Sequence, residues 1–170
     1  MELGLPSRRM TQPLRMPDVE SQRAAMKKLS FLIGSWAGEA RVLHGPGEPV
    51  ELNQQEEAQY RLDGLILTIE GIGCSKGDGK TALQALGFVS YDDRTGRYIM
   101  RAFNDGRYLE TELKLAEDGQ GIMWGFELGE IKTSSTLRIN EEGDWTELTE
   151  ITIGPQPPRK FMELRVSRQK

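Results

Sequence analysis

The sequence contains few of the residues that build the commonest catalytic and metal sites. Its 170 residues include one cysteine, Cys74, and one histidine, His44. An internal disulfide needs two cysteines, and a structural zinc site needs four cysteine or histidine ligands, so both are excluded. We therefore expect no metal site, and the lack of disulfides is typical of a cytoplasmic protein.

Long apolar runs and clusters of basic residues are also missing. No run approaches the roughly 20 apolar residues that cross a bilayer, so we expect no membrane partner. The 22 Lys and Arg residues are scattered among 26 Asp and Glu residues, and the formal net charge is −4 at pH 7. Nucleic-acid-binding surfaces need clustered basic residues, so we expect no nucleic-acid partner.

The first 16 residues differ from the rest of the chain. They carry Arg8, Arg9 and Arg15 but lack the apolar stretch of a secretory signal peptide, which again favours the cytoplasm. We interpret residues 1–16 as a flexible tail and residues 17–170 as a single domain, because a chain of this length can bury one sizeable core.

One helix is predicted, over residues 18–29. Asp18 is a suitable N-cap, because its side-chain oxygen can accept hydrogen bonds from the first free backbone N–H groups. Ala25, Met26 and Leu29 supply a modest apolar face. The helix leads into an apolar segment, Phe31-Leu32-Ile33.

After Gly34 the apolar residues recur with period two, which predicts ten β-strands bounded by turn residues. Asp-Gly pairs such as Asp63-Gly64 and Asp105-Gly106 favour tight hairpin turns. Short connections make successive strands antiparallel neighbours. We therefore predict an all-β, up-and-down antiparallel sheet that closes into a barrel of about ten strands, since closure removes its two exposed edges.

The segment Gly34-Ser35-Trp36, which follows the helix, resembles the Gly-x-Trp motif of the calycin superfamily. That group includes lipocalins, fatty-acid-binding proteins and nitrobindin-like barrels. Residues 31–39 are similar to the start of nitrobindins, and residues 86–103 are more similar to uncharacterised bacterial calycin-like proteins of unknown function. The resemblance spans roughly residues 29–168. It implies a lipocalin-like barrel in which a basic side chain of the last strand, Arg168, covers Trp36 and closes one end.

Ten strands should leave room inside the barrel for a small apolar or amphipathic ligand. Gln54 and Glu56 share a strand face with apolar residues, and polar groups there need a partner, which a ligand could supply. The alternative is a β-bulge that turns them outward. The expected ligand-binding residues are Gln54, Glu56, Tyr60, Leu67, Met100, Arg101, Leu113, Trp124, Phe126 and Met162.

Arg101 has two interpretations at this point. If the odd-numbered residues of its strand face inward, its guanidinium could bind a ligand carboxylate, as in fatty-acid-binding proteins. If Tyr98, Met100, Ala102 and Asn104 face inward instead, Arg101 is a solvated residue of the outer wall. The periodicity alone does not decide between them.

Catalytic motifs are not evident, and we expect a binding protein that is not an enzyme. His44 and Cys74 end strands that run toward the same pole, but no third residue orients them as a nucleophile and base. The segment Gly71-Ile72-Gly73 precedes no helix, so it does not match a phosphate-binding loop.

Two other functions stay open as alternatives. One is a haem-binding, nitrobindin-like sensor, or an enzyme that uses residues at the barrel rim. Nitrobindins ligate haem iron through a histidine late in the chain, and this chain has none after His44, so we expect no cofactor. The other alternative is a filled barrel that acts only as an interaction module. Nothing in the residues decides whether an exposed strand mediates a homodimer.

Overall fold

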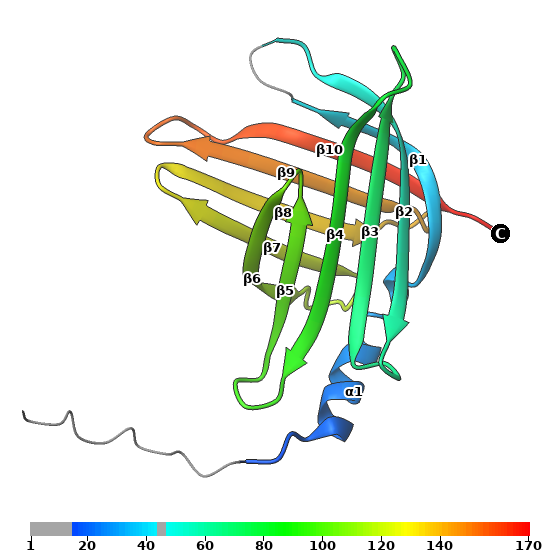
Figure 1. The fold of residues 1–170 in the computed structure, drawn as a ribbon, viewed down its shortest axis with the longest axis vertical. Coiled ribbons are helices and arrows are strands. Elements are labelled where there is room, and N and C mark those ends of the chain that lie inside the picture. The colour runs from blue at the N-terminus through cyan, green and yellow to red at the C-terminus, as the bar shows by residue number, and fades with distance from the viewer. Residues whose placement is uncertain (1–14, 44–46) are drawn as a thin grey trace, which may run out of the picture.

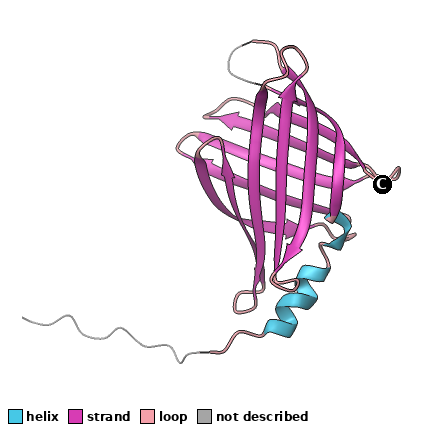
Figure 2. Cartoon of the chain, turned by 45° about the vertical axis from the view of Figure 1, so that its right-hand side comes forward, coloured by secondary structure: helices cyan, strands magenta, loops and turns pink. Residues whose placement is uncertain are grey.

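The computed structural model describes residues 15–43 and 47–170. Most of the predicted tail, residues 1–16, and the side chain of His44 lie outside these ranges. Within them, one α-helix and one 3-10 turn precede ten strands, as Figures 1 and 2 show. No helix in the described part of the chain is long and apolar enough to cross a membrane.

The strands form a closed antiparallel barrel in which each strand pairs with its neighbours in the sequence and β1 pairs with β10. The predicted all-β barrel of ten strands is therefore confirmed. The elements are α1 (Val19–Lys27), η1 (Ser30–Leu32), β1 (Gly34–Val42), β2 (Val50–Arg61), β3 (Ile66–Ser75), β4 (Thr81–Asp92), β5 (Arg97–Asn104), β6 (Arg107–Leu115), β7 (Gly121–Leu128), β8 (Ile131–Ile139), β9 (Trp145–Ile153) and β10 (Arg159–Arg168).

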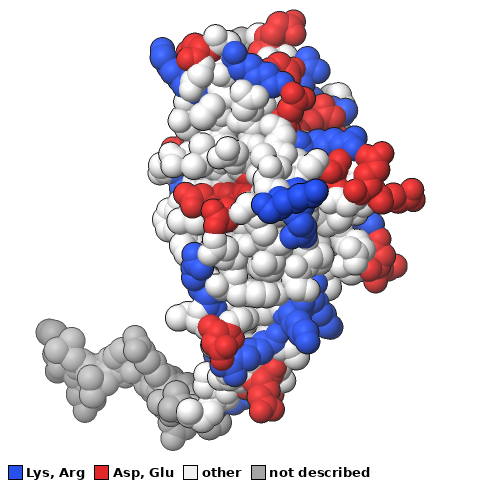
Figure 3. Space-filling model, turned by 90° about the vertical axis from the view of Figure 1, so that its right-hand side faces the viewer, with Lys and Arg blue, Asp and Glu red and all other residues white. Residues whose placement is uncertain are grey.

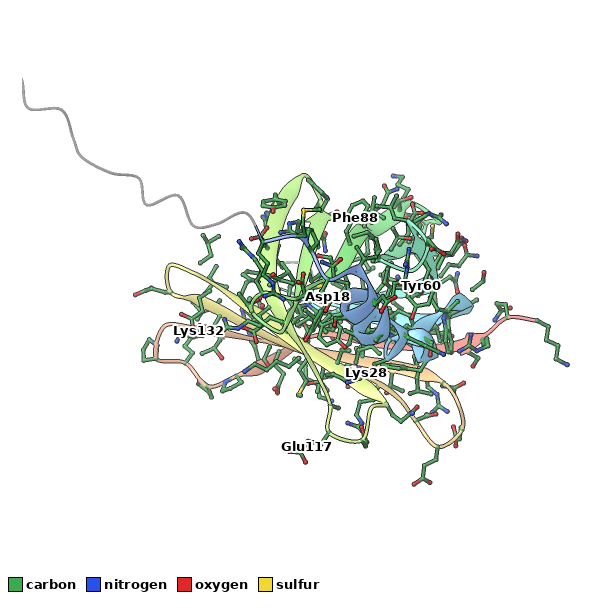
Figure 4. All side chains as sticks on the ribbon, turned by 90° about the horizontal axis from the view of Figure 1, so that it is seen from below. Asp18, Lys28, Tyr60, Phe88, Glu117 and Lys132 are labelled. Atoms are coloured by element: carbon green, nitrogen blue, oxygen red, sulfur yellow. The ribbon has the colours of Figure 1, made fainter. Side chains whose placement is uncertain are left out.

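The helix α1 covers one end of the barrel, which we call the closed end; Figure 4 shows this end from below, with Tyr60 beside the helix. The hydroxyl groups of Tyr60 and Tyr98 donate to the backbone carbonyls of Met26 and Ala25, each over 2.7 Å. Asp18 is the N-cap, as predicted, and accepts from the backbone N–H of Ser21.

The helix ends at Lys27, two residues before the predicted end. The backbone N–H groups of Lys28 and Leu29 donate to the carbonyls of Ala25 and Met26, three residues back instead of four. Such bonds tighten the last turn of a helix. The chain then enters η1, whose Leu32 is fully buried.

Trp36 and Arg168 complete the closed end in the way that the motif resemblance implied. The Arg168 guanidinium lies 4.1 Å from the centroid of the Trp36 ring and donates to the carbonyls of Phe31 and Ile33. The Trp36 indole N–H donates to the carbonyl of Leu32 over 3.0 Å. A Cβ atom on Gly34 would lie 2.5 Å from a guanidinium nitrogen of Arg168, so the glycine of the motif makes room for this contact.

The hydrophobic core begins at α1 and continues along the inward faces of the strands, as far as Val42 and Leu52 near the other end of β1 and β2. Met26, Leu29 and Leu32 are completely buried, and they pack with inward residues of the strands. Burial of each such side chain contributes about 1.5 to 3 kcal/mol. Buried strand residues of this core include Trp36, Leu52, Leu67, Val89, Leu113, Ile122, Leu137, Trp145 and Val166.

The opposite end, where the turns 105–106 and 129–130 lie, is accessible to solvent, and we call it the open end. Asp105 and Gly106 form a two-residue turn with φ angles of 49° and 76°, which is the tight hairpin that the Asp-Gly pair predicted. Leu128 lies on the inward face of β7 at this end and is 69% exposed.

Candidate functional site

Gln54 and Glu56 lie on the inward face of β2. Each alternates with exposed residues along the strand, and only 1% of Gln54 and 8% of Glu56 is exposed. The amide Nε2 of Gln54 donates to Oε1 of Glu56 over 2.7 Å. The pairing of β2 with β1 and β3 has no bulge at these positions, so the alternative in which both residues turn outward is wrong.

Two glycines of β3 make the space in which these polar side chains lie. Gly71 pairs with Glu56, and Gly73 pairs with Gln54. A Cβ atom on Gly71 would lie 2.7 Å from both carboxylate oxygens of Glu56, and one on Gly73 would lie 2.4 Å from Oε1 of Gln54. Real Cβ atoms do not approach other atoms so closely. Gly71 and Gly73, which have no side chain, therefore leave the space that the side chains of Glu56 and Gln54 occupy.

Glu147 is a further inward carboxyl group that the sequence analysis did not identify. It pairs with Leu137 of β8 and Leu164 of β10, both of which are buried on the inward face. Its strand has polar residues on both faces, so the alternation gave no clear signal. Glu147 is partly accessible as a residue, but protein surrounds its carboxyl group. The loss of water around the carboxyl group raises its pKa to about 7.

Glu56 and Glu147 influence each other across the barrel interior. Burial is the main cause that raises the pKa of Glu56 to about 8, and the negative charge of Glu147 raises it further. The hydrogen bond from Gln54 lowers the pKa in part. Neither carboxyl group has an ion-pair partner in the part of the chain that the structure describes.

Two buried polar atoms in this region have no hydrogen-bond partner among the described residues. They are Oε1 of Gln54 and the indole nitrogen Nε1 of Trp145. The Trp145 indole lies beside Glu147 and lowers its pKa in part, although its N–H makes no hydrogen bond of ordinary geometry. We call Gln54, Glu56, Trp145 and Glu147 the polar cluster. Buried groups without partners are uncommon, because each costs free energy.

The expected apolar lining divides between the two halves of the barrel. Leu67, Met100 and Leu113 face inward but are packed in the core at the closed end. Tyr60 also faces inward, and its hydroxyl donates a hydrogen bond to the carbonyl of Met26. These four residues therefore hold the closed end together in this structure.

Three other expected residues lie where a molecule could reach them. Trp124 and Phe126 of β7 and Met162 of β10 face inward and are partly exposed. Near them, β6 and β7 pair through only two residues each. The Thr111 hydroxyl then bridges the two strands by donating to the carbonyl of Gly125 over 2.6 Å.

Arg101 lies on the outer face of the wall, and the hypothesis of an inward guanidinium is wrong. Its strand places Tyr98, Met100 and Ala102 inward, because they pair with the inward residues of β4 and β6. The Arg101 side chain is 46% exposed and forms an ion pair with Glu110, with 2.8 Å between Nε and Oε2. Arg101 therefore cannot orient a ligand in the interior.

The outer wall has two shallow hollows, of about 340 and about 630 Å³. The larger one, over β8, β9, β10, β1 and β2, is lined mainly by charged residues that already form ion pairs, such as Arg41 with Glu51. Figure 3 shows basic and acidic side chains interspersed on one face of the molecule. The smaller hollow, over β1, β2 and β3, is lined by Glu57 and Glu70 and by one side of Glu56, and Glu147 of β9 lines the larger one.

Cys74 lies on the outer face of β3, half-buried, with no disulfide among the described residues. No cluster of three or more metal-ligating side chains occurs within residues 15–43 and 47–170. Since His44 lies outside the described residues, its distance from Cys74 and its suitability as a haem ligand stay untested.

Two solved structures share this architecture. Rv2717c from M. tuberculosis matches with a TM-score of 0.64 at 18% sequence identity, over 86% of this chain and 98% of that chain. The S-type phycobiliprotein lyase CPES from Guillardia theta matches with a TM-score of 0.58 at 12% identity, over 89% of this chain and 93% of that chain. No protein-family model and no curated protein matches the sequence. At these identities the likeness shows the fold alone, which is calycin-like.

Proposed function

We propose that this protein binds a small apolar or amphipathic molecule inside the barrel, with the polar end of the molecule at the polar cluster. The observation that carries the proposal is the unpartnered Oε1 of Gln54, which is buried beside two inward carboxyl groups. A ligand that hydrogen-bonds to this atom would remove the cost of leaving it unpaired.

The open end supplies the route and the apolar contacts. Leu109, Phe126 and Met162 face inward there and are only partly buried. Burial of their remaining apolar surface by a ligand would contribute roughly 25 cal/mol per Å². The same region supports a binding protein over the alternative of a filled barrel, because a filled interior would cover these side chains.

The proposal is of a cytoplasmic binding protein without a cofactor, not of an enzyme. The polar cluster contains two carboxyl groups, an amide and an indole, and it has no hydroxyl or thiol nucleophile beside a base. The fold is shared with a protein whose name identifies it as a phycobiliprotein lyase, which is consistent with a small-molecule function for a barrel of this kind.

The proposal is tested by filling the open half with one large side chain. Ala102 faces inward on β5, and Phe103 faces outward and is 51% exposed. We expect Ala102→Trp to lower the uptake of the uncharged fluorescent probe N-phenyl-1-naphthylamine at least about tenfold, while the matched variant Phe103→Trp keeps the wild-type affinity. Native mass spectrometry of protein fresh from cells should show a co-purified small molecule that is reduced in Ala102→Trp.

The proposal is contradicted if wild-type protein takes up no probe and carries no co-purified mass. It is equally contradicted if Ala102→Trp and Phe103→Trp affect uptake to the same extent, because the probe would then bind to the outer wall. Thermal unfolding of both variants shows whether the barrel is intact.

A further inference from the structure

The polar cluster offers more hydrogen-bond acceptors than donors. The Nε2 group of Gln54 donates to Oε1 of Glu56, and Oε1 of Gln54 has no partner among the described residues. The second oxygen of Glu56 and the carboxyl oxygens of Glu147 add further acceptors when these groups are ionised. The remaining donor is the indole N–H of Trp145, which lies beside Glu147.

No basic side chain in the described part of the chain balances these carboxyl groups from inside. Within residues 15–43 and 47–170, basic residues on the inward face occur only at the two ends of the barrel. Arg107 and Arg159 are exposed at the open end. Arg168 at the closed end covers Trp36 and donates to backbone carbonyls. The interior between the two ends therefore combines acidic groups with an apolar wall.

We infer that the polar end of the ligand is a cationic nitrogen group, such as a protonated primary amine or an amidinium. This inference rests on the proposed function. The N–H groups of such a cation would donate to Oε1 of Gln54 and to the carboxylates of Glu56 and Glu147. Its positive charge would offset the cost of burying the two negative charges. A carboxylate end group, which an inward Arg101 would have favoured, meets only acceptors and like charges here.

The inference predicts that binding of such a cation strengthens as pH rises from 6 to 8.5. In the empty protein, burial raises the pKa of Glu56 to about 8 and that of Glu147 to about 7, so both carboxyl groups are largely protonated at pH 6. Glu147 is the titratable group that faces Glu56, while its paired neighbours Trp36 and Gly71 do not titrate. An alkylamine, like a lysine side chain with a pKa of about 10.4, stays protonated at pH 8.5.

The test compares three ten-carbon probes that differ only in their end group: decylamine, decanol and decanoate. Each is titrated below its micelle concentration into full-length protein, by calorimetry and by displacement of the fluorescent probe. We expect decylamine to bind at least about tenfold more tightly than decanol at pH 8.5, and decanoate to bind more weakly than decanol. At pH 6 the advantage of decylamine should largely disappear.

Variants then locate the preference. Glu56→Gln and Glu147→Gln should each reduce the ratio of decylamine affinity to decanol affinity about tenfold. Glu57→Gln, on the outward face of the same strand, is the matched control and should keep the preference.

A second pair of variants displaces the carboxylate without removing it. Gly71→Ala places a Cβ atom 2.7 Å from both Glu56 oxygens, whereas the nearest atom to a Cβ on Gly87, also inward, is the Ile69 carbonyl oxygen at 3.8 Å. Gly71→Ala should therefore weaken decylamine binding more than Gly87→Ala.

The possible outcomes separate this inference from the proposed function. If none of the three probes binds, the proposed function fails. If decanol or decanoate binds as tightly as decylamine at pH 8.5, the barrel holds a ligand but the inference is overturned. If the double variant Glu56→Gln and Glu147→Gln keeps the full preference for decylamine, the polar cluster does not provide it and the inference is also overturned.

Discussion

At the scale of single residues, the acidic side chains inside the barrel have the largest consequences. The Glu56 side chain is buried against Gly71. An apolar residue in place of Glu56 would be buried at a lower cost in free energy. The hydrogen bond from Gln54 offsets only part of the cost of burying Glu56, since its pKa remains raised. A residue that destabilises the empty protein at neutral pH is typical of a binding or catalytic site.

Replacement of Glu56 should change the dependence of stability on pH. The folded protein raises the pKa of Glu56 from 4.5 to about 8, so its protonated form is favoured in the native state. The native state therefore loses stability as pH rises from 4.5 to about 8, by an amount on the order of 3 to 5 kcal/mol. Glu56→Gln cannot ionise, and urea denaturation should show that it is more stable than wild type at pH 8.

The matched control is Glu57→Gln, which should follow the wild-type curve because Glu57 is exposed on the outer face of β2. Near pH 4.5 the stabilities of wild type and Glu56→Gln should converge. If the two curves stay parallel from pH 5 to 8.5, Glu56 is not desolvated in the folded protein and the account of the polar cluster is wrong.

At the scale of elements, α1 covers the closed end, and hydrogen bonds from the barrel hold its C-terminal turn. The hydroxyl groups of Tyr60 and Tyr98 come from β2 and β5 and donate to carbonyls at the end of the helix. These carbonyls also accept from the backbone N–H groups of Lys28 and Leu29, so each tyrosine hydroxyl uses the second lone pair of its carbonyl. Asp93, in the turn between β4 and β5, accepts from the backbone N–H of Asp18 and from Gln22, which holds the other end of the helix.

Removal of one tyrosine hydroxyl should weaken the attachment of α1 to the closed end without disrupting the barrel. We expect Tyr98→Phe to lower the free energy of unfolding by about 0.5 to 1.5 kcal/mol, because one buried hydrogen bond is lost. Tyr91→Phe is a suitable control, since the Tyr91 ring packs against Tyr98 but its hydroxyl makes no hydrogen bond among the described residues. Hydrogen exchange should quicken for the amides of α1 in Tyr98→Phe only. Equal effects in both variants would show that ring packing, not the hydrogen bond, holds the helix.

At the scale of the whole molecule, the barrel combines a packed part, next to α1 and along β1 and β2, with an accessible half formed by β5 to β8 near the open end. The core around Trp36 and Trp145, whose rings meet edge to face at 5.7 Å, holds the closed end. The inward residues of β5 to β8 near the open end are partly exposed, and β6 and β7 pair only near the closed end. On β2, by contrast, Leu52 and Ala58 are completely buried on the two sides of Gln54 and Glu56, so the polar cluster is enclosed by apolar packing.

The sequence predicts most of this architecture, because the period-two pattern and the turn residues are local signals. The pairing of Trp36 with Arg168 followed from a motif resemblance. The apolar neighbours of Gln54 and Glu56 indicated an inward position, but a β-bulge stayed an alternative until the register of β2 was known. The orientation of Arg101 could not be decided, since both faces of β5 carry apolar residues and only the register with β4 and β6 distinguishes them. Glu147 was missed for a similar reason, because Thr and Glu residues occur on both faces of β9.

The three tryptophans offer the most direct test of the central claim that a ligand occupies the barrel interior at the polar cluster. Trp124 lies in the accessible half, Trp145 belongs to the cluster, and the Trp36 indole N–H is bonded to Leu32 at the closed end. The measurement is a titration of ¹⁵N-labelled protein with decylamine at pH 8.5, followed through the three indole N–H resonances. The account predicts saturable shifts for Trp124 and Trp145, with Trp36 shifting least. Unchanged Trp124 and Trp145 resonances in the presence of excess decylamine would contradict it.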